Sequence, residues 1–271
     1  MIFFLTGTGN SFYVAKRIAA ATGDRCASIT QAFDAGAPFS EERVGIVCPV
    51  YNHDLPPLVK RFLQTVTIDT PYLFLVLTYG NRAGGAQQIA REFLEAQGLS
   101  ASYINTLLMV DNWLPGYDIA EECAMDKHTE EHLAEICADV VQRRTFLLPA
   151  TDEELAIYQR GIEKYGAIFE DIDFLRGFLT ITDACTHCGT CARVCPSRCI
   201  HIANDENGNV TVERLAESGL ICTACLGCAH ACPAYAINIS MGEKNPSAHY
   251  LNEHVTLDEL ARANESRNGQ S

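Results

Sequence analysis

Positive charge is scarce in this sequence. Its 271 residues include 20 lysines and arginines against 34 aspartates and glutamates, which gives a formal net charge of −14. Proteins that bind nucleic acid carry basic patches, so we expect no nucleic-acid partner.

The sequence also has no apolar run as long as a membrane span. Met1 opens directly into a short apolar run and a turn, without the pattern of a secretory signal peptide. We therefore expect a cytoplasmic protein.

Two common phosphate-binding motifs are missing from the first turn of the chain, although that turn is rich in glycine. A dinucleotide fingerprint would need a third glycine near position 12, where Phe12 stands, and a Walker A loop would need a Gly-Lys-Ser/Thr triplet, which is absent here. What remains is a site for the phosphate of a mononucleotide. Amides at a helix start, together with hydroxyls, can hold a phosphate without a lysine. The residues expected to do so are Thr6, Gly7, Thr8, Gly9, Asn10 and Ser11.

Cysteine, by contrast, is plentiful and regularly spaced. Eight of the 13 cysteines form two copies of one pattern, Cys185-x2-Cys188-x2-Cys191-x3-Cys195-Pro196 and Cys222-x2-Cys225-x2-Cys228-x3-Cys232-Pro233. This spacing is typical of bacterial proteins with two [4Fe–4S] clusters, in which the fourth cysteine of each run binds the other cluster. One cluster is therefore expected on Cys185, Cys188, Cys191 and Cys232. The second is expected on Cys222, Cys225, Cys228 and Cys195.

Zinc and disulfide bonds are the alternative uses of so many cysteines. Structural zinc takes four ligands, usually as two cysteine pairs separated by a loop, whereas each run here offers four closely spaced thiols. Disulfide bonds need an oxidising compartment, which the absence of a signal peptide disfavours.

A ninth cysteine, Cys199, corresponds to Ala236 in the repeat, whose offset is 37 residues (222 − 185). We interpret Cys199 as a small buried residue and not as a ligand.

Residues 1 to about 145 alternate apolar runs with amphipathic segments, which indicates a parallel sheet covered by helices. The expected strands are Met1–Leu5, Arg25–Ile29, Val44–Val50, Tyr72–Thr78 and Tyr103–Val110. The expected helices are Ser11–Thr22, Pro57–Thr65 and Gly85–Gln97. Five strands alternating with helices favour a flavodoxin-like, doubly wound α/β fold. In such folds, ligands bind at the carboxyl ends of the strands.

Two further loops follow expected strands at that edge. The first contains Pro49, Tyr51 and Asn52, and the second contains Thr78, Tyr79 and Gly80. Each places a tyrosine among polar residues and turn formers, which suits the flank of a flat heteroaromatic ring. Either tyrosine alone could simply cover an edge of the core. Together with the phosphate loop, the two tyrosines favour a flavin.

These segments carry a resemblance to known families. Phe4-Leu-Thr-Gly-Thr-Gly-Asn-Ser, Cys48-Pro-Val-Tyr followed by Leu55-Pro-Pro, and Thr78-Tyr-Gly resemble flavodoxin, while residues 183–240 resemble two-[4Fe–4S] bacterial ferredoxin. The whole chain is similar to the flavodoxin–ferredoxin fusion family, which consists of small electron carriers of the anaerobe type. The resemblance implies FMN, with Thr6–Ser11 at the phosphate and Tyr51 and Tyr79 at the ring. Flavodoxins commonly stack a tryptophan where this chain has Tyr51, whereas its single tryptophan, Trp113, follows the fifth expected strand.

Four parts are therefore expected along the chain. They are a flavodoxin-like FMN-binding domain at 1–148, a helical connector at 149–177, a small α+β two-[4Fe–4S] ferredoxin domain at 178–240 and a C-terminal tail at 241–271.

The expected function is electron transfer between the two clusters and FMN, and on to redox protein partners, toward which the acidic charge would steer it. Two alternatives stay open: a ferredoxin-dependent flavin oxidoreductase acting on a small molecule, and a redox subunit of a larger complex.

Overall fold

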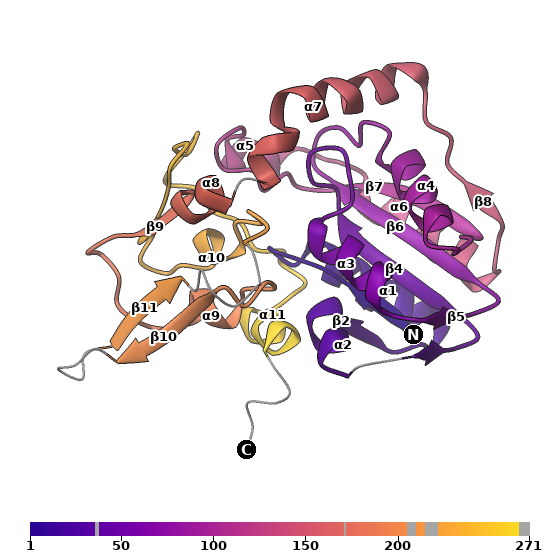
Figure 1. The fold of residues 1–271 in the computed structure, drawn as a ribbon, viewed down its shortest axis with the longest axis horizontal. Coiled ribbons are helices and arrows are strands. Elements are labelled where there is room, and N and C mark those ends of the chain that lie inside the picture. Colours follow the sequence, from indigo (N-terminus) through magenta and orange to yellow (C-terminus); the bar gives the residue numbers. More distant parts are fainter. Residues whose placement is uncertain (36–37, 171, 205–209, 215–221, 266–271) are drawn as a thin grey trace.

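The chain folds into an α/β part built on a parallel sheet and a smaller part that lies beside it, as the computed structural model in Figure 1 shows. The structure describes residues 1–35, 38–170, 172–204, 210–214 and 222–265. Among these residues, no helix is both long enough and apolar enough to cross a membrane.

A six-stranded sheet forms the centre of the first part, and all of its neighbouring strands are parallel. In spatial order its strands are β2 (Cys26–Ser28), β1 (Ile2–Phe4), β4 (Val44–Pro49), β6 (Leu73–Tyr79), β7 (Tyr103–Leu108) and β8 (Phe146–Leu147). The first five follow the order 2-1-3-4-5 of a flavodoxin-like sheet. All five expected strands are present, but the expected strand number is wrong by one. The sixth strand, β8, has two residues, too few for a periodic pattern to reveal.

Helices cover both faces of this sheet. One face carries α1 (Asn10–Thr22) and α6 (Thr129–Val141). The other face carries α2 (Ile29–Ala35), α3 (Pro57–Thr65) and α4 (Ala86–Ala96). Neighbouring residues of β1 point to opposite faces, so Phe4 packs with the first layer and Phe3 with the second. Burial on both faces explains why the strands read as continuous apolar runs in the sequence.

Shorter elements complete the first part and lead to the second. They are β3 (Phe39–Ser40), which pairs in parallel with β5 (Ile68–Asp69), then α5 (Ile119–Ala124), α7 (Asp152–Glu170) and α8 (Ile172–Gly177). Helix α7 begins with a capping box: the Glu154 amide donates to Thr151 Oγ1 at 3.2 Å, and the Thr151 amide donates to Glu154 Oε2 at 2.8 Å. Within the expected connector, the helix therefore starts at Asp152, three residues after the expected boundary at 149.

Two copies of one short unit build the second part. Its elements are β9 (Leu179–Ile181), α9 (Thr190–Arg193), β10 (Ile200–Asn204), β11 (Val210–Arg214), α10 (Gly227–His230) and β12 (Ile237–Ile239). The two helices differ by the 37-residue offset of the cysteine repeat (227 − 190). β9 pairs with β12, and β10 pairs antiparallel with β11. Residues 205–209, which connect β10 to β11, lie outside the described residues.

The backbone repeats as closely as the cysteines do. Left-handed conformations occur at three pairs of equivalent positions: His187 and Ala224, Gly189 and Leu226, and Arg198 and Tyr235. Residues other than glycine rarely adopt this conformation. Because the same positions adopt it in both copies with different side chains, the path of the cysteine loops sets the conformation.

The C-terminal segment folds back over both parts instead of trailing from them. Its helix α11 (Leu257–Asn264) starts with a capping box at Thr256. The Lys16 ammonium of α1 contacts Glu259 Oε1 at 2.6 Å, and Asn264 Nδ2 donates to the carbonyl of Val194 in the second part at 2.9 Å. The segment therefore fastens the two parts together.

Candidate functional site

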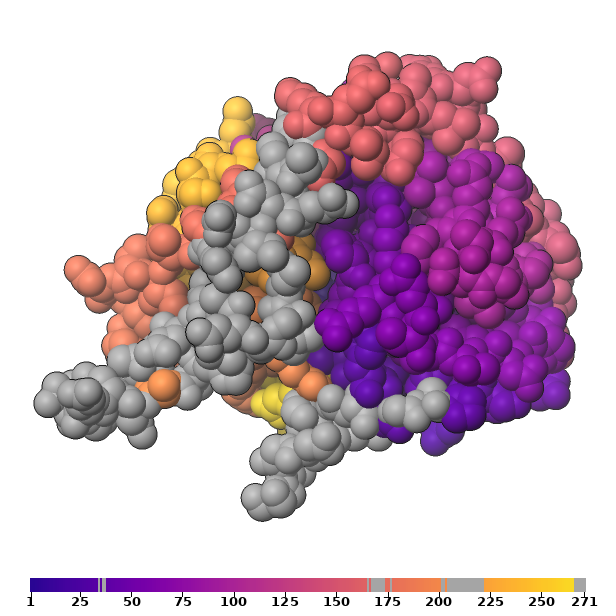
Figure 2. Space-filling view, viewed as in Figure 1, coloured from indigo at the N-terminus to yellow at the C-terminus, as the bar shows by residue number. Residues whose placement is uncertain are grey.

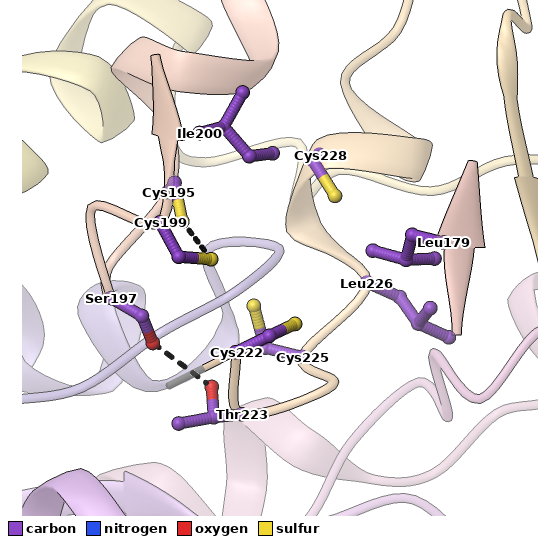
Figure 3. A pocket seen from close by; sticks show the side chains of 10 residues that line it. All are labelled: Leu179, Cys195, Ser197, Cys199, Ile200, Cys222, Thr223, Cys225, Leu226 and Cys228. Carbon is purple, nitrogen blue, oxygen red and sulfur yellow. Dashed lines mark hydrogen bonds between the residues drawn. The ribbon is translucent and has the colours of Figure 1, made fainter. Parts of the chain in front are cut away.

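Two cavities in the second part are lined by the motif cysteines. One cavity, of about 330 Å³, is lined by Cys185, Cys188, Cys191 and Cys232. The other cavity, of about 320 Å³ and drawn in Figure 3, is lined by Cys195, Cys222, Cys225 and Cys228, together with Cys199. The motif cysteines thus separate into the two sets that their spacing predicted, and the last cysteine of each run lies in the other run's set.

The sulfur atoms of each set surround a space instead of meeting at a point. In the described part of the chain, no three cysteine, histidine, aspartate or glutamate side chains converge as they would on one metal ion.

Backbone amides donate to cysteine sulfurs at equivalent places in the two sets. The His187 amide lies 3.4 Å from Cys185 Sγ, and the Ala224 amide lies 3.4 Å from Cys222 Sγ. Both donors are left-handed residues, so the unusual backbone conformation brings each amide to its sulfur. Hydrogen bonds of this kind stabilise thiolates and are among the factors that set a cluster's reduction potential.

Burial differs between the two sets. Cys188 of the first set is exposed, and its pKa is lowered, mainly by the hydrogen bond with Thr190. In the second set, burial raises the pKa of Cys225 to about 12 and raises that of Cys228 as well. Without iron, these buried sulfurs keep their protons. Burial likewise raises the pKa of Cys191 in the first set to about 11, so binding of iron to either set has to release protons.

The expected phosphate loop links β1 to α1 and is buried. Gly9 has a φ of 102°, which other residues rarely adopt, and its amide donates to Thr6 Oγ1 at 3.0 Å. The hydroxyls of Ser11 and Thr78 lie 2.8 Å apart. That bond joins the loop to the end of β6, so two of the segments predicted to bind one ligand do meet.

Several amides of this loop have no acceptor. The N–H groups of Thr8, Asn10 and Ser11 donate no hydrogen bond to any residue that the structure describes. Helix starts leave their first amides without internal partners, and buried amides without an acceptor are costly. The loop thus has the donors that an anion would need.

The second part of the chain covers this loop directly. A Cβ atom added to Gly7 would lie 2.7 Å from the carbonyl oxygen of Cys225, and one added to Gly227 would lie 2.5 Å from the carbonyl oxygen of Gly7. The two backbones are therefore in contact, with no room for a side chain between them. This contact makes the phosphate loop and the second set of cysteines neighbours. In Figure 2 the second part, in orange and yellow, lies beside the α/β part, in indigo and magenta.

Polar residues of the C-terminal segment also bind the loop, and the sequence did not reveal them. The Asn252 amide donates to the Thr8 carbonyl at 2.8 Å, and the Tyr250 hydroxyl donates to Asn10 Oδ1 at 2.6 Å. From the other side, Asn112 Nδ2 donates to Thr8 Oγ1 at 2.9 Å. Isolated polar residues in loops have no periodicity, so only tertiary structure could identify them.

The first tyrosine loop reaches the cysteines. Tyr51 is half-buried and closes a tight turn through two backbone hydrogen bonds with Asp54, of 2.9 and 3.0 Å. Its phenol lies near Cys225 and Cys222, and burial, followed by the charge of Cys225, raises the pKa of Tyr51 well above its usual value. Tyr51 therefore lies between the edge of the sheet and the second set of cysteines.

The other expected ring residues lie at the same edge under α7. Pro49 and Thr78 are register partners on β4 and β6. Asn52 Nδ2 donates to the carbonyl of Gly161 on α7 at 3.4 Å. Gly80 lies tightly against Asp111, since an added Cβ would come within 2.3 Å of that side chain.

Tyr79 and Trp113 lie away from Tyr51. Burial raises the pKa of Tyr79, which lies near Glu154 at the start of α7. No ring contact within the described residues joins Tyr79 to Tyr51. Trp113 stacks on Phe178, with ring centroids 5.8 Å apart, and packs against the core of the second part. The structure therefore brings Tyr51, but not Tyr79, to the cysteines.

Comparison with known families identifies the cysteine segment. Residues 184–236 match the 4Fe-4S dicluster domain, which supports two [4Fe–4S] clusters and an electron-transfer role. No curated protein matches the chain.

Solved structures with some likeness to the chain include three proteins. A putative flavoprotein from Bacteroides uniformis is 12% identical over 45% of this chain and 93% of its own, with a TM-score of 0.33. The Trp repressor binding protein from Bacillus subtilis is 10% identical over 56% and 100%, with a TM-score of 0.35. Rubredoxin oxygen:oxidoreductase from Desulfovibrio gigas is 14% identical over 49% and 35%, with a TM-score of 0.32. At these TM-scores the likenesses add nothing to what the strand order already says.

Proposed function

We propose that this chain, which joins a flavodoxin-like α/β domain to a 4Fe-4S dicluster domain, passes electrons between two [4Fe–4S] clusters and FMN and on to redox protein partners. The observation that carries the proposal is the backbone contact between Gly7 of the phosphate loop and Cys225 of the second cysteine set. A flavin anchored at that loop would have a cluster as its immediate neighbour. We also propose a cytoplasmic location, since these thiols must stay reduced to bind iron.

We assign the cluster ligands from the two cavities. The first cluster would be held by Cys185, Cys188, Cys191 and Cys232, and the second by Cys195, Cys222, Cys225 and Cys228. The amides that donate to Cys185 and Cys222 support this assignment, because they would offset the negative charge of thiolates bound to iron.

The phosphate loop fits the phosphate group of FMN. The amides of Thr8, Asn10 and Ser11, which have no acceptor in the described part of the chain, are donors, and the 13-residue helix α1 adds the positive end of its dipole. No acidic side chain stands in the first turn of α1 to repel an anion. FMN, when bound, supplies a ring that accepts one or two electrons.

Side chains and glycines of this chain set how close the two proposed sites lie and how the phosphate loop is covered. Gly7 and Gly227 let two backbones touch, which keeps the separation between the proposed sites short. The Tyr51 phenol is buried near Cys225 and Cys222. Tyr250 and Asn252 hold Asn10 in place and close the outer side of the loop.

The proposal is tested by the order of the electron-transfer reaction. The full chain, reconstituted without oxygen with iron, sulfide and FMN, is mixed rapidly with a one-electron reductant while cluster and flavin absorbance are followed. We expect the rate constant for exchange between clusters and flavin to stay constant over a tenfold dilution of the protein. A rate that rises in proportion to protein concentration would mean transfer between molecules and would overturn the proposal.

Riboflavin, which lacks the phosphate, is the matched control for that experiment. With riboflavin in place of FMN, we expect bleaching of the clusters but no flavin phase that is independent of concentration. Loss of hydrogen bonds between the loop and a charged group should weaken binding by at least about tenfold, or about 1.4 kcal/mol. Equal behaviour of riboflavin and FMN would contradict the role of the Thr6–Ser11 loop.

A further inference from the structure

The second cysteine cavity is lined by five cysteines, one more than a cluster needs. The extra one is Cys199, which is 4% exposed. Its Sγ lies 3.6 Å from the Sγ of Cys195, and Figure 3 shows the two side chains next to each other. The sequence correctly predicted a buried residue at this position. It did not predict that the sulfur would lie beside a proposed ligand.

The turn that carries Cys199 has a counterpart in the first cavity. The Arg198 amide donates to the Cys195 carbonyl at 3.1 Å, just as the Tyr235 amide donates to the Cys232 carbonyl at 3.2 Å. Arg198 and Tyr235 have φ values of 50° and 51°. Position 236, the equivalent of position 199, likewise lines its cavity, but it is an alanine. The fold therefore directs this position toward the cluster in both copies, and only one copy supplies a thiol.

We propose that Cys199 is a reserve ligand of the second cluster, able to bind the iron that Cys195 binds. This proposal rests on the ligand assignment made above. In the exchange, the bond between iron and Cys195 Sγ breaks and a bond between iron and Cys199 Sγ forms. The proton of the Cys199 thiol passes to the Cys195 sulfur. No electron is gained or lost by the cluster or by either sulfur.

The short sulfur–sulfur distance explains why such an exchange is open to this pair. The Sγ atoms of Cys195 and Cys199 are 3.6 Å apart, and both side chains line the same cavity. A sulfur this close needs a change of side-chain rotamer, and not of backbone path, to replace its neighbour.

The test counts iron and sulfide in the full chain after anaerobic reconstitution. The unaltered chain should hold about eight irons, four per cluster. Cys195→Ala should still hold about eight, with an electron paramagnetic resonance spectrum of the second cluster that differs from the unaltered one. Cys199→Ala should also hold about eight. Cys195→Ala combined with Cys199→Ala should hold about four, because the second cavity then has only three thiols.

The first cavity provides the matched control. Cys232→Ala should hold about four irons, because Ala236 offers no replacement thiol. Adding Ala236→Cys to Cys232→Ala should restore about eight, and this pair tests the geometry even if Cys195→Ala folds poorly.

Two results would overturn the proposal, and they are distinguishable. Four irons in Cys195→Ala, equal to the double variant, would show that Cys199 does not bind iron while leaving the ligand assignment intact. Fewer than eight irons in the unaltered chain would overturn the ligand assignment itself and this proposal with it.

Discussion

At the scale of single residues, two glycines decide how close the parts of this molecule can come. Gly7 and Gly227 belong to different parts, and each lies against a backbone carbonyl of the other part. Gly7 has no unusual φ, so another residue could adopt its conformation. The need for glycine at position 7 is therefore one of space and not of conformational freedom.

We expect Gly7→Ala to push the phosphate loop away from Cys225. Its Cβ would lie 2.7 Å from a backbone oxygen, so one backbone must shift. Such overpacking typically costs about 1–3 kcal/mol. Stopped-flow absorbance should show slower exchange between clusters and flavin, with the iron content of the unaltered chain retained.

Gly177→Ala is the control for that variant, because a Cβ at position 177 meets nothing within 4 Å. It should leave the transfer rate and the iron content unchanged. Unaltered transfer in Gly7→Ala would argue that the contact at Gly7 has no bearing on the path between the sites.

At the scale of elements, the C-terminal helix α11 makes contacts with both parts that the sequence did not predict. Its capping box and its contact with Lys16 hold it against α1, while Asn264 binds the second part. The contact between Lys16 and Glu259 joins two partly exposed side chains, so it contributes little by itself. The cap at Thr256 is the more consequential feature for the stability of the helix.

We expect Thr256→Ala to loosen α11 without affecting the sheet. Loss of an N-cap costs about 1 kcal/mol, which corresponds to about fivefold faster amide exchange where opening is local. Hydrogen exchange measured by mass spectrometry should show the change in 257–264 and not in β4. Thr151→Ala removes the equivalent cap of α7 and should change exchange in α7 only. Equal exchange of α11 in Thr256→Ala and the unaltered chain would contradict this role of the cap.

The sequence predicted long elements well and short or isolated features poorly. Buried strands such as β4 and β6 leave continuous apolar runs, and the cysteine spacing directly reflects the geometry of the ligand loops. The two-residue β8 is too short to leave such a pattern. The positions of Cys199 and Asn252 depend on contacts between residues far apart in sequence, which no local pattern encodes.

At the scale of the whole molecule, the two parts share one hydrophobic core. Val194 and Ala231 of the cysteine part, and Val255 of the C-terminal segment, belong to the same cluster of buried residues as Val14 of α1 and Phe74 of β6. The parts are consequently not independent in stability, although they are distinct in fold.

We expect removal of iron to destabilise the α/β part as well as the cysteine part. Without clusters the small part loses the centre of its fold, and its apolar residues leave the shared core. Loss of the burial of Val194 and Ala231 would cost about 2 kcal/mol or more, which corresponds to a Tm lower by about 4–8 °C. Circular dichroism before and after anaerobic chelation should detect this shift. An α/β part that melts at an unchanged temperature would contradict the shared core.

The cover over the phosphate loop has a consequence for how the protein is made. Residues 250–255 leave the ribosome after the α/β part, and they close the loop only when both parts have formed. Domains fold as they emerge, at about 5–20 residues per second, so the roughly 100 residues between the two segments take on the order of 5–20 s to synthesise. During that interval the nascent α/β part has an open phosphate loop. Under the proposed function, translation would thus provide a window for loading the flavin, which closes as the cysteine part is completed.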